Sequence, residues 1–115
     1  MQQHFHWQGL DPSARGASVA MGNFDGVHRG HQAVIDLARG SAPLGIVTFE
    51  PHPRQFFTPG APAFRLMNAE ARANRLARLG VQHLFQLPFD ATLAAFSPEG
   101  FVNEVLADGL GISHV

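Results

Sequence analysis

The fold of this chain is decided by one stretch, Met21-Gly22-Asn23-Phe24-Asp25-Gly26-Val27-His28-Arg29-Gly30-His31. An apolar segment typical of a strand precedes it at residues 17–21, and apolar residues at helical spacing follow it. Gly22 and Gly26 let the backbone approach a ligand closely, and the free N–H groups of a helix that begins here attract negative charge. His28 and His31 lie three residues apart, so one face of that helix presents both imidazoles. The stretch predicts a phosphate-binding turn between a strand and a helix.

The remaining segments repeat this alternation of strands and helices. The patterns predict a strand at Leu44–Phe49, a helix at Ala69–Leu79, a strand at Val81–Leu87, a helix from Pro98 to Asp108 with Phe101, Val102, Val105 and Leu106 as its buried stripe, and the opening of another strand at Ser113–Val115. Because the first strand is almost wholly apolar, we expect both faces of its sheet to be covered. The fold class is therefore α/β, with a Rossmann-like open, mostly parallel sheet and helices on both faces. Ligands bind such sheets at the carboxyl ends of the strands.

Composition narrows the class of protein. The chain has 115 residues, of which 45% are hydrophobic and 15% charged, so it fits one globular domain. A net charge of −1 gives no general attraction for nucleic acid or for a membrane surface, and we expect neither as a partner. No apolar run approaches the length of a membrane span, and the start lacks the pattern of a signal peptide, which predicts a cytoplasmic location. The chain has no cysteine, so no disulfide or zinc–thiolate site is expected.

Two further features have more than one interpretation. Prolines interrupt residues 50–66, and the aromatic rings of Phe56, Phe57 and Phe64 there could form a wall for a flat ligand or simply fix the loop to the core. Arg72, Arg75 and Arg78 could bind an anion, but we interpret them as the solvated face of a helix.

The histidine pair suits one kind of chemistry best. Two imidazoles that donate to a phosphate can stabilise the charge that develops when an α-phosphorus is displaced directly. One alternative is that the histidines are satisfied core residues. Another is a metal-dependent hydrolase in which His28 and His31 join His52, Asp25 or Glu50 as ligands. Metal ligation alone would not require the two glycines of the turn.

The sequence also resembles a known family. The string from Gly22 to Gln32, followed by Thr48-Phe49-Glu50-Pro51-His52-Pro53, resembles the N-terminal FMN adenylyltransferase module of bacterial bifunctional riboflavin kinase/FAD synthetase, in the His-x-Gly-His nucleotidyltransferase superfamily. His-x-Gly-His alone also resembles pantetheine-phosphate and nicotinamide-mononucleotide adenylyltransferases. The resemblance implies a nucleotidyltransferase-type fold across residues 1–115.

The resemblance implies an activity and a set of site residues. The activity is transfer of AMP from ATP to FMN, which gives FAD and pyrophosphate, with Mg²⁺ accompanying ATP and no metal held by the protein alone. His28 and His31 would be catalytic. The nucleotide would bind Gly22, Asn23, Phe24, Asp25 and Gly26, and the flavin would bind Pro51, Pro53 and Phe57 and also His52 and Arg54.

The same resemblance implies that parts of the family's sequence are absent. We find neither its Asp-Phe-x-Phe-Gly and Ser-Ser-Thr-x-Ile-Arg motifs nor its riboflavin kinase domain. We therefore expect a sheet that is incomplete at its C-terminal side and a strand at residues 17–21 with an open edge, through which copies would self-associate. An isolated chain of this kind would be inactive, and the alternative function is nucleotide or flavin binding without turnover.

Overall fold

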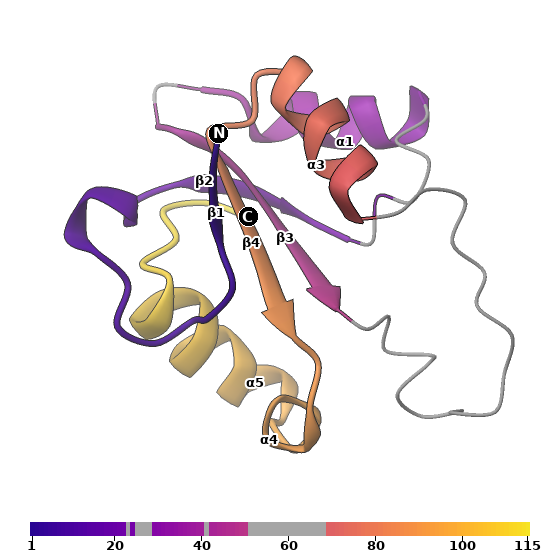
Figure 1. Cartoon of the computed structure of the whole chain (residues 1–115). Coiled ribbons are helices and arrows are strands. Elements are labelled where there is room, and N and C mark those ends of the chain that lie inside the picture. Colours follow the sequence, from indigo (N-terminus) through magenta and orange to yellow (C-terminus); the bar gives the residue numbers. More distant parts are fainter. Residues whose placement is uncertain (23, 25–28, 41, 51–68) are drawn as a thin grey trace, which may run out of the picture.

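The computed structural model describes residues 1–22, 24, 29–40, 42–50 and 69–115, and these form a parallel sheet with helices on both faces (Figure 1). The sheet has four strands in the order β1-β4-β3-β2. Their bounds are Gln2–His4 for β1, Ser18–Met21 for β2, Leu44–Glu50 for β3 and His83–Pro88 for β4. All three strand pairs are parallel. The α/β class predicted from the sequence is confirmed.

The helices divide between the two faces of the sheet (Figure 1). One face carries α1 (Arg29–Ala38) and α3 (Ala69–Arg78), and the other carries α4 (Ala91–Ala94), α5 (Pro98–Gly100) and the π-helical segment η2 (Phe101–Gly109); a short 3-10 turn, η1, spans Pro12–Ala14. The longest of these described helices have 10 residues, and none is long and apolar enough to cross a membrane.

The core consists of two apolar clusters separated by the sheet. Ile46 of β3 and Leu84 of β4 pack on the side of α1 and α3, whereas the next residue of each strand, Val47 and Phe85, packs on the side of η2. Successive side chains of a strand point to opposite faces, so continuous apolar runs fill both clusters. For this reason apolarity alone predicts β2, β3 and β4, and the predicted bounds of these strands agree with the structure to within two residues at each end.

Besides the 3-10 turn η1, a short strand and a short α-helix escaped the sequence analysis. Strand β1 is polar and exposed for most of its length, and it pairs with β4 at the edge of the sheet. His4 Nε2 lies 3.1 Å from His83 Nδ1, and the His4 ring stacks on Phe85 with centroids 5.0 Å apart. The other missed element, α4, begins where the Asp90 side chain accepts from the Leu93 N–H. Pairing with β4 defines the strand, and a side-chain cap begins the helix, so neither element carries an apolar periodicity in the sequence.

The buried stripe predicted for the last helix is only partly correct. Val105 and Leu106 are buried and Phe101 is half-buried, but Val102 is 51% exposed. The reason is the π-helical winding of η2, in which the Leu110 N–H donates to the Val105 carbonyl at 2.9 Å. A bond spanning five residues shifts the apolar face away from the spacing of an α-helix.

The edge of β2 is less open than predicted. His114 forms an isolated parallel bridge with Ser18, and its carbonyl accepts from the Val19 N–H at 2.8 Å. The Ser113 N–H donates to the Ala17 carbonyl at 2.9 Å. Residues 113–115 thus begin to pair with β2, as expected of an opening strand, and the open part of the edge is limited to the end of β2.

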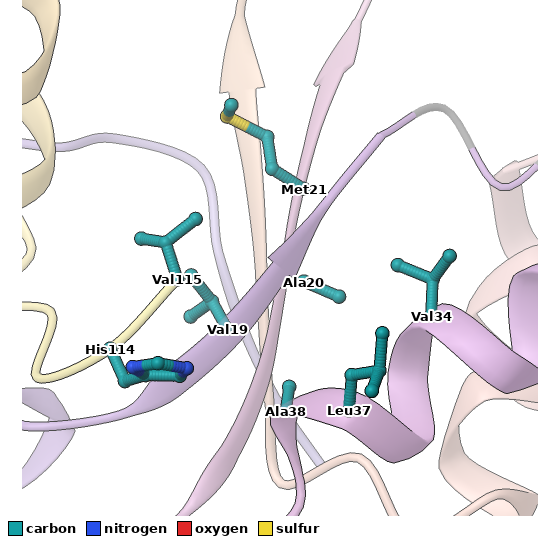
Figure 2. Close-up of a pocket in the computed structure, with 8 residues that line it drawn as sticks. All are labelled: Val19, Ala20, Met21, Val34, Leu37, Ala38, His114 and Val115. Atoms are coloured by element: carbon teal, nitrogen blue, oxygen red, sulfur yellow. The ribbon is translucent and has the colours of Figure 1, made fainter.

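An apolar groove of about 300 Å³ flanks this open part (Figure 2). Its lining comes from β2, α1 and the last two residues, namely Val19, Ala20, Met21, Val34, Leu37, Ala38, His114 and Val115. No Asp, Glu, Lys or Arg is among these residues. Leu37 is 81% exposed, and Met21, Val34 and Val115 are also exposed. The groove lacks the charged side chains that usually discourage pairing at a sheet edge.

The self-association predicted from the sequence can be tested at this groove. We expect sedimentation velocity to show assembly that increases with protein concentration, because a second copy would cover the end of β2 and the exposed Leu37. Leu37→Lys should reduce that assembly, since a buried unpaired charge is unfavourable. Val102→Lys, at an exposed residue of η2, is the matched control. Sedimentation as a monomer at every concentration would contradict the prediction.

The His4–His83 contact predicts that stability depends on pH. Burial lowers the pKa of both imidazoles below the usual 6.5; the His83 charge also lowers the pKa of His4, and the N-terminal charge that of His83. As pH falls below 6.5, the unfolded chain therefore binds more protons than the folded chain, and the free energy of unfolding decreases.

Urea unfolding at about pH 7.5 and about pH 5.5 measures this effect, since these values bracket the usual pKa of histidine. His4→Gln should reduce the loss of stability between the two, whereas the exposed control His6→Gln should leave it unchanged. An equal loss in the wild type and in His4→Gln would show that the pair is not responsible.

Candidate functional site

The carboxyl ends of β2 and β3 lie side by side. Met21 pairs with Val47, and the Gly22 N–H donates to the Val47 carbonyl at 3.0 Å. The glycine-rich stretch leaves the sheet at Gly22, and the second distinctive string passes through the end of β3 at Glu50. The two strings therefore leave the sheet at neighbouring points of the carboxyl edge, where parallel sheets bind ligands.

Three of the predicted site residues, Gly22, Phe24 and His31, belong to the part of the chain that the structure describes. The others lie outside the described residues: Asn23, Asp25, Gly26, His28, Pro51, His52, Pro53, Arg54 and Phe57, together with the loop phenylalanines Phe56 and Phe64. Their assignments remain predictions.

Gly22 and Phe24 fit closely together. Phe24 adopts a left-handed backbone conformation with φ of 56°, and its side chain is 2% exposed within the cluster under α1 and α3. A Cβ atom at Gly22 would lie only 3.2 Å from Cε2 of the Phe24 ring. Glycine at position 22 thus leaves space for this ring. Since the ring is buried, any contact of Phe24 with a nucleotide would involve its backbone.

His31 occupies the first turn of α1 and is half-buried. Its ring lies against that of Phe24, with centroids 5.2 Å apart and planes tilted by 60°. One turn further along the helix, Ile35 is fully buried and attaches α1 to the sheet. The structure therefore places His31 between the core and the carboxyl edge of β2.

The interpretation of Arg72 as a solvent-facing residue is wrong. Arg72 is 2% exposed, and its Nη2 lies 3.4 Å from Oε2 of Glu50, whose side chain is 33% exposed. Arg75 and Arg78 are exposed, as predicted. Arg72 differs because it is four residues before the buried Leu76, so both side chains lie on the helix face toward the sheet.

A polar group at the end of β3 was missed by the sequence analysis. Thr48 and Glu50 share the α1/α3 face with Ile46, because side chains alternate along a strand. Thr48 is fully buried, and its Oγ1 has no hydrogen-bond partner among the described residues. Polar residues at alternate positions in an otherwise apolar strand were the available signal. Thr48, Glu50 and Arg72 are thus polar residues at the carboxyl end of β3, on the side of the sheet that α1 and α3 cover.

The metal-dependent alternative involves residues that lie mostly outside the described ranges. Within the described ranges, no group of three or more His, Asp or Glu side chains is placed to hold a metal ion. His28, His52 and Asp25 are outside those ranges, so that alternative remains a hypothesis.

Comparison with known proteins identifies the family. The family model for FAD synthetase matches residues 10–115. The chain belongs to the FAD synthetase family. This FAD synthetase-family chain is 42% identical over 111 residues to a bifunctional riboflavin kinase/FMN adenylyltransferase of Pseudomonas fluorescens, an alignment that covers 92% of the chain and 35% of the relative.

Two other relatives of the same name agree with this assignment. The identity is 34% over 103 residues for the protein of Escherichia coli K12, covering 84% of the chain and 33% of the relative, and 33% over 102 residues for that of Bacillus subtilis, covering 84% and 32%. The chain thus spans about a third of the length of these relatives. Their names associate the family with FAD biosynthesis.

A solved structure supports the fold of this FAD synthetase-family chain. The crystal structure titled as a macrolide-efflux protein from Streptococcus pneumoniae superposes with a TM-score of 0.78 and 24% identity, covering 96% of this chain and 39% of that one. At this identity the likeness shows the fold alone.

The buried ion pair predicts unequal roles for two neighbouring arginines. Arg72→Leu should lower the free energy of unfolding by about 2 kcal/mol, less than the range for a fully buried pair because Glu50 is partly exposed. Arg75→Leu, at an exposed position of α3, should change it by less than about 0.5 kcal/mol. Urea unfolding of both variants measures the difference. Equal effects would show that the Glu50 contact does not stabilise the fold.

Proposed function

We propose that the chain carries a site at which AMP is transferred from ATP to FMN, with FAD and pyrophosphate as products. The observation that carries this proposal is the position of the Gly22–His31 stretch, which leaves β2 beside the carboxyl end of β3 in a member of the FAD synthetase family. A strand end, a glycine-rich turn and a helix start provide backbone N–H groups for phosphate oxygens.

The proposed reaction is a direct displacement. A phosphate oxygen of FMN forms a bond to the α-phosphorus of ATP, and the bond from that phosphorus to the bridging oxygen breaks as pyrophosphate leaves. Gly22, Asn23, Phe24, Asp25 and Gly26 would hold the nucleotide through the turn. His28 and His31 would donate to the oxygens on which negative charge increases in the transition state.

The flavin is assigned to the side of the site that begins at β3. Phe49 and Phe89 pack edge to face with centroids 5.7 Å apart, and the Phe89 N–H donates to the Glu50 carbonyl at 3.1 Å. These contacts fix the end of the strand. The residues proposed to contact FMN follow it directly, namely Pro51, His52, Pro53, Arg54 and Phe57.

Magnesium enters this proposal as a companion of ATP. The carboxylate of Glu50, the described acidic group at the end of β3, is already paired with Arg72 and does not provide an uncompensated oxygen ligand. Mg²⁺ prefers oxygen ligands and is commonly held by substrate phosphates with few protein groups. We therefore assign its binding to the phosphates, whose charge it would neutralise.

The second candidate function is binding of nucleotide and flavin without turnover. The relatives that are named for the activity are much longer than this chain, which spans about a third of them. Catalysis by this length of chain is thus a separate claim from binding. The two functions share the site and differ in whether FAD is formed.

Histidine replacement tests the proposed chemistry. In a full-length family protein that carries this sequence, supplied with ATP, Mg²⁺ and FMN, we expect chromatography to detect FAD, and His31→Ala to lower its rate of formation by about 100-fold, because a transition-state donor is lost. Quenching of flavin fluorescence should show that FMN binding is kept. His6→Ala, at an exposed residue outside the site, is the control.

Binding measurements separate the two candidates. Calorimetric titration with ATP and fluorescence titration with FMN should both saturate. Saturation by both ligands with no FAD formed would favour binding without turnover. A chain that is folded by circular dichroism but binds neither ligand would contradict both functions.

A further inference from the structure

We propose that Phe24 is a positioning residue whose ring sets the orientation of the His31 imidazole at the start of α1. The arrangement is visible without any ligand, and only its consequence for catalysis rests on the proposed function. The ring has three described neighbours that matter here: Gly22 at the end of β2, His31 on α1, and the apolar cluster beneath them.

The backbone of Phe24 indicates that this ring has a specific use. A φ of 56° is favourable for glycine and disfavoured for a residue with a large side chain, at a cost of about 1 kcal/mol or more. The chain nevertheless carries phenylalanine here and buries its ring almost completely. Burial of an aromatic side chain offsets that cost and fixes the ring in one place.

The Phe24 ring lies close to Gly22 and to the His31 ring, so its position affects both residues. On one side, the ring edge lies 3.2 Å from where a Cβ of residue 22 would be, so a side chain at this position would push the ring away from the end of β2. On the other side, the His31 ring is within the distance and tilt favoured by aromatic pairs. A shift of Phe24 would therefore displace His31, and an error of 1 Å in a catalytic group can reduce a rate by about 100-fold.

The direct test follows the ring protons of His31 by NMR in the ligand-free chain. We expect Phe24→Leu, which keeps the site apolar but removes the ring beside the imidazole, to change the NOE signals between these protons and the rest of α1, because those signals report the orientation of the imidazole. Altered chemical shifts with unchanged NOE signals would reflect only the lost ring current and would count against the positioning role. Phe85→Leu is the matched control, since Phe85 is equally buried but belongs to the cluster on the opposite face of the sheet. His31→Gln assigns the signals among the seven histidines.

A double variant tests the steric link to Gly22. Gly22→Ala should push the Phe24 ring and shift the His31 signals, and the same substitution should have a smaller effect when residue 24 is already leucine. Such non-additivity is expected of residues in contact. The positioning role would be overturned if the His31 signals were unchanged in Phe24→Leu, or if they changed as much in Phe85→Leu. Additive effects in the double variant would also overturn it.

Nucleotide titration keeps this inference distinct from the proposed function. If the signals move with Phe24→Leu but the wild type does not bind ATP, the positioning role holds and the proposed function fails. If ATP binds and FAD forms, Phe24→Leu should lower kcat by about 100-fold with a smaller change in KM, since the misplaced group acts in the transition state. An unchanged kcat would overturn the catalytic consequence.

Discussion

The parallel pairing of β2 with β3 is the constraint on which the rest of the site depends. It places Met21 beside Val47, and the adjoining bond from the Gly22 N–H to the Val47 carbonyl fixes where the chain leaves the sheet. Parallel neighbours end at the same edge, so two segments separated in sequence start from one place. Both faces of these strands pack in apolar clusters, and in parallel sheets ligands bind outside the carboxyl ends of the strands.

The sequence was sufficient for the elements whose burial depends on apolarity. Strands β2, β3 and β4 are short apolar runs, and α3 ends before Gly80, which has the left-handed conformation expected of a helix stop. Sequence patterns failed where pairing or winding is determined in three dimensions. Strand β1 has no apolar pattern of its own, and it forms by pairing with β4. The exposure of Val102 follows from the π-helical hydrogen bonds of η2, which no local sequence pattern reveals.

The candidate site shows the same division. The glycines and histidines were noticeable by their close spacing, and their role in phosphate binding stays a prediction. The buried Arg72 was misread because its partner, Glu50, lies on another element. Gly22 was predicted for its backbone freedom, and the structure adds that its missing side chain leaves space for the Phe24 ring. The pattern of charges or glycines in a sequence does not show whether a residue faces solvent, a ligand or the core. The burial and the contacts of the residue in the structure show this.

The central claim is that a nucleotide binds at the carboxyl edge of β2, against the start of α1. Mapping amide chemical shifts of the chain during titration with ATP and Mg²⁺ tests it most directly. The account predicts saturable shifts concentrated at Gly22, Gly30 and His31, with little change in β1 or η2. Saturable shifts concentrated instead along η2 or around the groove beside Leu37 would contradict it.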